Sequence, residues 1–395
     1  MKITKVDIIL MEEKPVDNPA WSPVLCRVYT DEGIYGDGEA ALAYGRASHG
    51  AVGQLEDYAR LVIGMNPLDT EVIWNKLNQT TFWGLNGGPV IYAAISAIDV
   101  ACWDIKGKAF GAPVWQLLGG KMRQDLRCYA SQLQFGWTDH KEPASSNQDY
   151  VRAALLALDE GYDALKYDFF DFDEEGVNFT PRDRHGLLSK RYTDLVVGRL
   201  AAVRDAVGPA VDIIVENHSA TDVLSAMQLA HLMEPYDVFY FEEPCLSMPN
   251  LTRRVGEKCP LPLSQGERVY TRWQYMPYLE QGSVQVIQPD IGNCGGLTEA
   301  KKICDMAYAF DVSVQVHVCS SLLLTAAALQ LEAVIPNFQI HEHHVYNRYD
   351  YVRRLTTVDY QPEDGKLVVP DAPGIGNEIA PYCFERGAIT TVDAR

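Results

Sequence analysis

Six ionisable side chains recur along the second half of the sequence, 23 to 27 residues apart. Each follows a short apolar run, and most precede an amphipathic stretch. This order predicts consecutive strand–helix units, which take about 25 residues each. In a (β/α)8 barrel the catalytic groups lie at the carboxyl ends of the strands, where carboxylates and imidazoles can bind cations and transfer protons. The six residues are Glu216, Glu242, Glu267, Asp290, His317 and Glu342.

Three glutamates, Glu216, Glu242 and Glu267, end three successive predicted strands. Their carboxylates would converge at the mouth of the barrel, where they would repel one another. A hard divalent cation with oxygen ligands, Mg²⁺ or alternatively Mn²⁺, relieves that repulsion. The other interpretation is that each glutamate pairs with a nearby lysine or arginine. Three glutamates on consecutive strands favour the metal site.

A carboxylate and an imidazole, Asp290 and His317, end the next two predicted strands. A carboxylate that accepts a ring N–H orients the imidazole and raises its basicity, which suits a general base. His218 lies two residues after Glu216 and therefore on the same face of its strand. It would face His317 across the mouth, either as a general acid or as a support for a metal ligand.

Two further residues are candidates for binding the reacting anion. Lys166 ends the predicted strand ALKYD and could steady a substrate anion, or it could form a salt bridge with Asp168 two residues later. Glu342 ends the last predicted strand, within the sequence HEHH. It could hydrogen-bond an enolate oxygen, or it could pair with one of the histidines that flank it.

The elements that must position these groups follow from the spacing of apolar residues. Residues 1–45 alternate apolar and polar positions and predict strands, with a hairpin around an Asp-Glu-Gly turn at 31–33. Residues 50–118 have apolar residues at helical spacing. The first barrel strand is predicted at residues 125–133 and the second at residues 164–168.

The chain of 395 residues exceeds a plain barrel of about 250 residues by enough for a second domain. We therefore predict an α/β protein: a modified (β/α)8-type TIM barrel with an α+β capping domain. The barrel is expected to span residues 126–344. The capping domain is expected to comprise residues 1–125, with residues 345–395 packing back on it.

Two connecting segments stand out from the regular strand–helix pattern. Residues 169–192 are polar, rich in Asp and Arg, and predict a long loop at the active-site end, and long loops in compact domains are often functional. The turn GNCGGLTEA at residues 292–300 resembles an anion-binding helix N-terminus, although such glycine pairs are common in barrel loops.

Composition limits the partners that this protein could have. The formal net charge of −19 argues against nucleic acid or an anionic membrane as partner. No run approaches 18 apolar residues and the N-terminus resembles no signal peptide, so we predict a cytoplasmic protein. The nine cysteines match no zinc or disulfide framework and are expected to be reduced thiols.

Several motifs resemble those of one family over essentially the whole chain. AAISAIDVACWDIKGKAFGAPVWQLLGG resembles an N-terminal signature of the enolase superfamily, in its mandelate racemase subgroup. FEEP at 241–244, GE at 266–267, QPDIGNCGGLTEAKKI and QVHV resemble its barrel signatures. Within the subgroup, the pair in VENH, the strand-7 histidine and the long loop after strand 2 are most similar to the acid-sugar dehydratases.

The resemblance implies a set of residue roles at the barrel mouth. They are three Mg²⁺ ligands, a base with its orienting carboxylate, an acid, and a carboxylate on strand 8. The Mg²⁺ ligands correspond to Glu216, Glu242 and Glu267. The base corresponds to His317 and its orienting carboxylate to Asp290. The acid corresponds to His218 and the carboxylate on strand 8 to Glu342. The first ligand is usually Asp in this family, and Glu is one methylene longer.

A second departure from the family pattern lies on strand 2 and affects which reaction is expected. The usual Lys-x-Lys of strand 2 is Lys166-Tyr167-Asp168 here, so the lysine that would be a second base is absent. That favours dehydration over two-base racemisation. The family also implies capping-domain loops that close over the barrel, here the loop around Trp21 and residues 82–88. Trp21, Trp83 and Asp168 are therefore predicted to contact substrate.

The resemblance thus predicts a Mg²⁺-dependent hydro-lyase that removes the proton next to the carboxylate of a sugar acid and eliminates the 3-hydroxyl. The product would be a 2-keto-3-deoxy acid, and the protein would be a homo-oligomer, from dimer to octamer. An epimerase, racemase or cycloisomerase of a related acid is the alternative enzyme, and it would need a second base. A catalytically degenerate relative that acts as a binding or stress-response protein is the non-enzymatic alternative.

Overall fold

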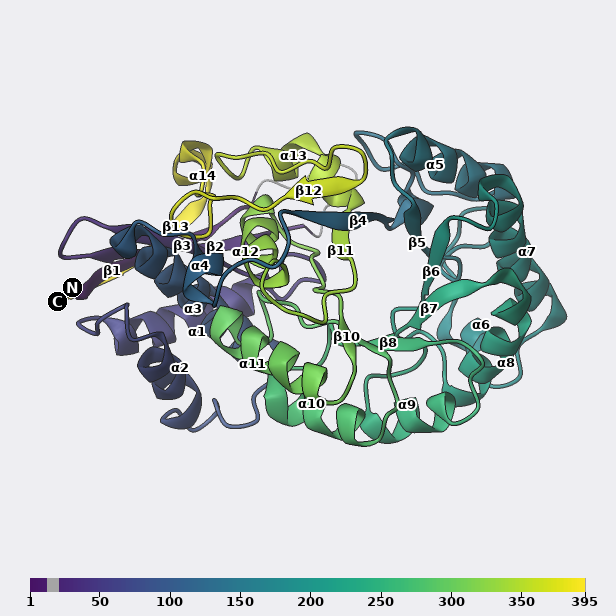
Figure 1. Ribbon diagram of the computed structural model, residues 1–395, viewed down its shortest axis with the longest axis horizontal. Coiled ribbons are helices and arrows are strands. Elements are labelled where there is room, and N and C mark those ends of the chain that lie inside the picture. Colours follow the sequence, from purple (N-terminus) through teal and green to yellow (C-terminus); the bar gives the residue numbers. More distant parts are fainter. Residues whose placement is uncertain (13–20, 395) are drawn as a thin grey trace.

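The computed structural model describes residues 1–12 and 21–394, and these residues form two sheets of different kinds (Figure 1). An antiparallel sheet of four strands lies at one end of the molecule, beside both chain termini. Eight parallel strands curl through the centre, with helices on their outer side. The predicted fold class, a modified (β/α)8 barrel with an α+β cap, is therefore confirmed.

The antiparallel sheet joins the two ends of the chain. Its strands, in order across the sheet, are β13 (Ala388–Asp393), β1 (Ile3–Leu10), β2 (Val24–Thr30) and β3 (Tyr35–Ala40). β2 and β3 form the hairpin predicted from the sequence, paired from Val24 with Ala40 to Tyr29 with Tyr35. β13 pairs antiparallel with β1 and so returns the C-terminus to the first strand.

Helices cover this sheet and separate it from the barrel. They are α1 (Ser48–Val62), α2 (Thr70–Gln79), α3 (Pro89–Phe110) and α4 (Val114–Leu117). α3 is buried along most of its length because the sheet covers one side and the barrel the other. β3 approaches α3 so closely that a Cβ atom on Gly38 would lie 2.0 Å from the carbonyl oxygen of Ala97. Only glycine fits at that contact.

The parallel sheet places the carboxyl ends of all its strands on one side. Its strands are β4 (Asp125–Ser131), β5 (Ala164–Asp168), β6 (Asp212–Glu216), β7 (Val238–Glu242), β8 (Leu263–Gln265), β9 (Val286–Ile287), β10 (Ser313–Val314) and β11 (His341–His344). Each strand from β4 to β9 pairs with the next, and β11 pairs with β4. A single parallel bridge between Val314 and Phe338 joins β10 to the chain entering β11.

Seven longer helices alternate with these strands. They are α5 (Asn147–Asp159), α7 (Lys190–Val207), α8 (Val223–Met233), α9 (Pro249–Gly256), α10 (Thr271–Glu280), α11 (Gly296–Ala309) and α12 (Leu322–Glu332). On α5 the buried residues Tyr150, Ala153, Ala154 and Ala157 recur at the spacing of one helical face. α12 is buried on every side.

The predicted loop after β5 is shorter than expected and contains a helical turn. The short helix α6 (Pro181–Arg184) interrupts it. α7 begins at Lys190 rather than after residue 192, because the side chain of Ser189 accepts the backbone N–H of Tyr192 and caps the helix. The insertion therefore spans residues 169–189.

Buried carboxylates of the cap bind the N-termini of two barrel helices. Asp99 on α3 accepts the backbone N–H of Thr298 in the first turn of α11, at 2.9 Å. Glu39 on β3 accepts the backbone N–H of Ser321, which caps α12. The exposed amides of a helix N-terminus favour a negative charge. The anion that meets the 292–300 turn is thus supplied by the protein itself.

The C-terminal segment contacts both sheets before it ends in β13. It contains α13 (Asp350–Arg353), β12 (Lys366–Val368) and α14 (Pro381–Arg386). β12 pairs antiparallel with β4 of the barrel. The following chain lies against α3, where the N–H of Ile375 donates to Asp104 at 3.0 Å.

Two composition-based expectations can be compared with the structure. The nine cysteines are all free thiols. Among the described helices, none has the length and apolar character needed to cross a bilayer.

Candidate active site

Strand register brings the first ionisable residues together at the mouth of the barrel. Glu216 is the last residue of β6 and Glu242 the last of β7, and the two are register partners. On the other side of β6, Asp168 at the end of β5 is the partner of Glu216. Glu267 lies two residues beyond β8. The carboxylates of Asp168, Glu216 and Glu242 therefore lie side by side at the ends of three adjacent strands.

Lys166 is the cation at the centre of this cluster. Its Nζ atom lies 3.2 Å from Glu216 Oε2, 3.0 Å from Glu242 Oε1 and 2.9 Å from Glu342 Oε1. Its side chain is 1% exposed. Burial lowers the pKa of Lys166, but the three carboxylates outweigh burial and raise that pKa well above its ordinary value. Lys166 does not pair with Asp168, which was the alternative left open by the sequence.

Glu342 on β11 is held by donors from three elements. Its Oε1 accepts the hydroxyl of Ser131 at 2.6 Å, and its Oε2 accepts the backbone N–H of Val318 at 2.9 Å. Burial raises the pKa of Glu342, but Lys166 and neighbouring donors lower it below its usual range. The adjacent His341 bonds to Glu332 at 2.5 Å, so Glu342 does not depend on it for a partner.

Asp290 and His317 form the hydrogen-bonded pair predicted from the sequence. His317 Nδ1 lies 2.7 Å from Asp290 Oδ2, and the other carboxylate oxygen accepts the backbone N–H of Gly292 at 2.7 Å. His317 Nε2 faces Glu267 Oε2 at 3.4 Å. Burial lowers the pKa of His317, but the charge of Glu267 and the bond to Asp290 raise it to about 10. Asp290 thus fixes the ring with Nε2 turned into the site.

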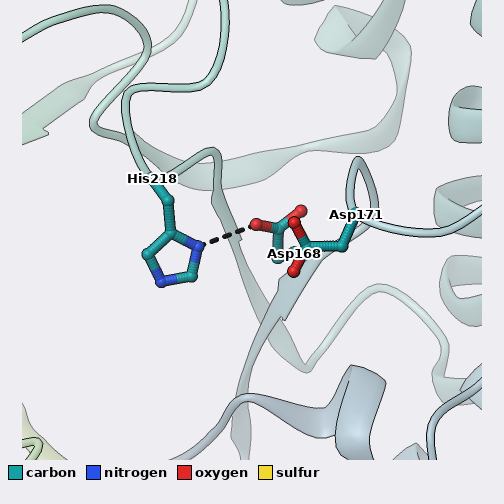
Figure 2. A group of neighbouring side chains, drawn as sticks. All are labelled: Asp168, Asp171 and His218. Atoms are coloured by element: carbon teal, nitrogen blue, oxygen red, sulfur yellow. Dashed lines mark hydrogen bonds and ion pairs between the residues drawn. The ribbon is translucent and has the colours of Figure 1, made fainter. Parts of the chain in front are cut away.

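His218 makes a second pair of the same kind, which the sequence did not predict. Figure 2 shows its ring beside Asp168, with Nδ1 2.8 Å from Asp168 Oδ2, and Asp171 on the far side of that carboxylate. His218 Nε2 lies 3.1 Å from Glu216 Oε1. Burial lowers the pKa of His218, but Glu216 and Asp168 raise it well above its ordinary value. Burial and the charge of Asp168 raise the pKa of Asp171 to about 7.

The turn that carries His218 has an unusual backbone. His218 and Ser219 have φ angles of 45° and 57°, in the left-handed region that favours glycine. Backbone bonds from Asn217 and Ser219 to residues 242 and 243 hold this turn against β7. The Asn217 amide group also donates to the carbonyl of Pro244 at 2.9 Å. Such strain is retained where the surrounding structure fixes it, commonly at functional sites.

The carboxylate cluster has the donor atoms that a hard divalent cation requires. Glu242 Oε2 is a buried oxygen without a hydrogen-bond partner, and Glu216 Oε1 faces His218 Nε2 at 3.1 Å. Ligand atoms of Glu216, Glu267 and His218 lie within 4.8 Å of one another. Unpartnered buried carboxylate oxygens are costly unless a cation or donor satisfies them. The residues present therefore fit a Mg²⁺ or Mn²⁺ ion.

The glutamates of the cluster differ in their electrostatic surroundings. Burial raises the pKa of Glu242 to about 8 despite the charge of Lys166. Burial also acts on Glu267, but Arg268 and His317 outweigh it and lower its pKa to about 2. Arg268 forms short ion pairs with both Glu267 and Glu243.

Four residues of the site were missed in the sequence. Gln132 donates to Glu216, and Gln134 donates to Gln132 and accepts the backbone N–H of Asp168 at 3.2 Å. Arg268 and Glu243 form the ion pair described above. The two glutamines directly follow the first barrel strand, and the other two residues adjoin predicted ligands. The position of each of these four residues close to a strand end is the sequence signal that could have identified them.

The three predicted substrate contacts lie in different environments. Asp168 is fully buried at the mouth. Trp21 is 1% exposed and packs edge-on against Tyr346, with ring centroids 5.5 Å apart. Trp83 is 75% exposed and packs against Phe82. Residues 13–20 of the Trp21 loop lie outside the described residues, so a contact of that loop with substrate stays a prediction.

Comparison with known proteins identifies the family. The model of the enolase C-terminal domain-like family matches residues 149–383, and that of the mandelate racemase / muconate lactonizing enzyme N-terminal domain matches residues 19–119. The chain belongs to the mandelate racemase subgroup of the enolase superfamily. It thereby joins the enzymes of the mandelate racemase / muconate lactonizing enzyme family, as its motifs predicted.

Curated members of this family resemble the chain over almost its whole length. A D-galactonate dehydratase of Pectobacterium atrosepticum is 32% identical over 389 residues, which cover 96% of this chain and 92% of that protein. A D-galactonate dehydratase of Ralstonia pickettii is 33% identical over the same shares.

Solved structures agree with the fold. The crystal structure of a Zymomonas mobilis ZM4 protein has a TM-score of 0.97 and 46% identity, covering all of both chains. A member of the enolase superfamily from Salmonella Typhimurium has a TM-score of 0.95 and 46% identity, covering 99% of this chain and 100% of that one.

Proposed function

We propose that this protein is a Mg²⁺-dependent acid-sugar dehydratase. It would abstract the proton on C2, next to the substrate carboxylate, and eliminate the 3-hydroxyl to give a 2-keto-3-deoxy acid. The observation that carries this proposal is the 2.7 Å hydrogen bond between Asp290 and His317, whose Nε2 faces Glu267 of the carboxylate cluster. The similarity to D-galactonate dehydratases supports the choice of sugar acids as substrates.

Glu216, Glu242 and Glu267 would hold the metal ion. The unpartnered Oε2 of Glu242 supports this assignment, as does the place of all three residues at or just beyond adjacent strand ends. A bound Mg²⁺ would supply charge stabilisation for the substrate carboxylate and for the enediolate that forms from it. Mn²⁺ has similar ligand preferences and would serve as a substitute.

His317 is the proposed general base. Its Nδ1–H donates to Asp290, so its Nε2 is the atom that would take the C2 proton. The charge of Glu267 contributes to the raised pKa of His317. Engagement of Glu267 in metal binding would offset that charge and favour the neutral ring that a base requires.

Lys166 would stabilise the oxygen atoms of the enediolate, and Glu342, which Lys166 keeps ionised, would hold that ammonium group in place. Lys166 is a buried cation within reach of Glu342, and such a fixed charge stabilises developing anions without reorganisation. His218, on the opposite side, would protonate the departing 3-hydroxyl, which leaves as water. The resulting enol then tautomerises to the 2-keto acid.

The residue at position 168 favours dehydration over the alternative enzyme reactions. An epimerase or racemase needs a second base on the other face of the substrate, where the family pattern places a second lysine. Here Asp168 occupies that position and bonds to His218. A non-enzymatic binding protein of this fold would have little need to keep both hydrogen-bonded Asp–His pairs.

A screen of aldonic and aldaric acids tests this function. The protein would be incubated with each acid and Mg²⁺, beginning with D-galactonate, and 2-keto products would be trapped with semicarbazide. We expect one or a few acids to give product, and His317→Asn to give none. Epimerised acid without a keto product would favour the epimerase. Mg²⁺ binding without turnover of any acid would favour the binding protein.

Light scattering in solution tests the predicted homo-oligomer. A mass that is a multiple of the 44.1 kDa chain would agree with it, and a mass of one chain would contradict it.

A further inference from the structure

Both oxygen atoms of the Asp168 carboxylate are occupied by fixed donors. Oδ2 lies 2.8 Å from His218 Nδ1, and Oδ1 accepts the backbone N–H of Phe170 at 2.8 Å. The backbone N–H of Asp168 donates to Gln134 at 3.2 Å. The residue is fully buried, so its carboxylate has little freedom to turn. Asp168 therefore offers His218 an acceptor of fixed position.

His218 is held from its backbone side as well. The left-handed φ of 45° directs its side chain from the turn after β6 back toward β5, where Asp168 lies. The ring is consequently oriented with Nδ1 toward Asp168 and Nε2 toward Glu216 Oε1, 3.1 Å away. This arrangement repeats that of His317, whose Nδ1 faces Asp290 and whose Nε2 faces Glu267.

The insertion after β5 closes the outer side of this pair. Asp171 lies beside Asp168 in Figure 2, on the side away from His218, and Arg184 of α6 lies 3.6 Å from Asp171. Arg184 also donates to the carbonyl of Phe179 at 2.6 Å. Asp168 thus lies between the histidine and a part of the insertion that is itself anchored.

We propose that Asp168 is a positioning residue for His218: it accepts the Nδ1–H and so presents Nε2–H to the leaving group of the substrate. This inference rests on the proposed dehydratase function and deepens it. In the step concerned, the C3–O bond breaks as the enediolate electrons form the C2–C3 double bond. The proton on His218 Nε2 moves to the departing oxygen, and one water molecule leaves.

A competing interpretation gives the same residues another task. A histidine that binds a metal commonly donates its second ring N–H to a carboxylate, and Glu216, Glu267 and His218 are close enough to share an ion. In that case the loss of Asp168 would weaken metal binding and impair proton abstraction together with elimination. A merely structural role would also impair both steps.

Kinetics of Asp168→Asn distinguish these roles. Asparagine can turn its NH₂ toward Nδ1, so it no longer holds the ring with Nδ1 as donor. We expect dehydration of the acid found in the screen to fall by roughly 10²- to 10⁴-fold, the usual contribution of a general acid. Exchange of the C2 proton in D₂O and the affinity for Mg²⁺ should change less than threefold. The control is Asp163→Asn, an exposed residue directly before β5, at the end of the strand away from the site.

A substrate whose leaving group needs no proton sharpens the test. With the 3-deoxy-3-fluoro analogue of the same acid, fluoride departs without protonation, so Asp168→Asn should regain nearly the full rate of the unmodified protein. Equal losses with the hydroxyl and fluoro substrates would overturn the inference. Parallel losses of exchange and Mg²⁺ affinity would overturn it in favour of the metal-ligand role.

A spectroscopic measurement tests the pair even if no acid is turned over. In protein with ¹⁵N-labelled histidine, the His218 signals are assigned with His218→Asn. The unmodified protein should show a protonated Nδ1 with a strong hydrogen bond, and Asp168→Asn should shift that nitrogen. An unchanged nitrogen shift would contradict the positioning role. Failure of the whole screen with this shift present would instead contradict the proposed function.

Discussion

Lys166 Nζ lies 3.0 Å from Glu242 Oε1, and the two residues belong to strands that flank β6 on opposite sides. Both side chains are 1% exposed. The same ammonium group reaches Glu216 and Glu342, so one buried cation serves three buried carboxylates. Its removal would leave those charges uncompensated. Lys166 therefore contributes to the stability of this carboxylate cluster.

We predict that Lys166→Met lowers the free energy of unfolding in EDTA by about 3–5 kcal/mol, the usual cost of removing one partner from a buried ion pair. Urea denaturation measures this loss. Lys301→Met is the control, because Lys301 pairs with Asp305 at the surface and such pairs contribute less than about 1 kcal/mol. Equal losses in the two variants would show that Lys166 does not compensate the cluster.

The base assignment predicts the fate of the C2 proton. His317→Asn should reduce exchange of that proton in D₂O and dehydration by the same factor, roughly 10²- to 10⁴-fold, because both begin with its removal. NMR of the sugar acid measures the exchange. His231→Asn, at an exposed position on α8, should leave both rates unchanged. Exchange that persists at nearly the normal rate in His317→Asn would exclude this base.

The proposed metal site predicts stabilisation by Mg²⁺. A ligand at 100 times its dissociation constant stabilises the folded state by about 2.7 kcal/mol, so saturating Mg²⁺ should raise the melting temperature above that measured in EDTA. Glu242→Gln should lose most of this increase, because it removes a charged ligand. Glu257→Gln, which alters only a surface pair with Arg253, should keep it. A Mg²⁺ response that is unchanged in Glu242→Gln would place the ion elsewhere.

The spacing of charged residues predicted two strand ends and placed the other groups close to theirs, because a barrel repeats one strand and one helix in nearly constant length. Glu267, Asp290 and His317 lie two or three residues beyond their strands, and Glu342 lies inside β11 rather than at its end. Glu216 and Glu242 end their strands, and the bond between Asp290 and His317 follows from neighbouring strands. The start of α7 at Lys190 was not predicted, because the serine that caps it lies in a polar stretch without an apolar period.

The choice of partners at the mouth could not be read from the sequence. Alternation along a strand shows that Lys166 and Asp168 share a face, but strand register decides which groups each of them meets. In the structure Asp168 lies opposite Glu216, close to the histidine that follows it. The left-handed backbone of His218 has no glycine to signal it and is imposed by contacts with β7.

A buried carboxyl group between the capping domain and the barrel predicts that folding stability depends on pH. Burial raises the pKa of Asp99 from 3.8 to about 7, although its bond from Thr298 acts in the opposite direction. Between pH 3.8 and about pH 7, Asp99 is protonated in the folded protein but ionised in the unfolded chain. Stability therefore falls as the pH rises through this range, because the folded state binds more protons.

Asp99→Asn should remove this dependence, since asparagine imitates the protonated acid and can still accept the N–H of Thr298. A difference of about three pKa units corresponds to roughly 4 kcal/mol in full, of which roughly 2–3 kcal/mol falls between pH 5 and pH 8. Relative to the unmodified protein, the variant should gain that amount on going from pH 5 to pH 8. Urea denaturation at the two pH values measures the gain. Asp57→Asn, exposed on α1, should show none. The same gain in both variants would mean that the buried carboxyl of Asp99 is not its source.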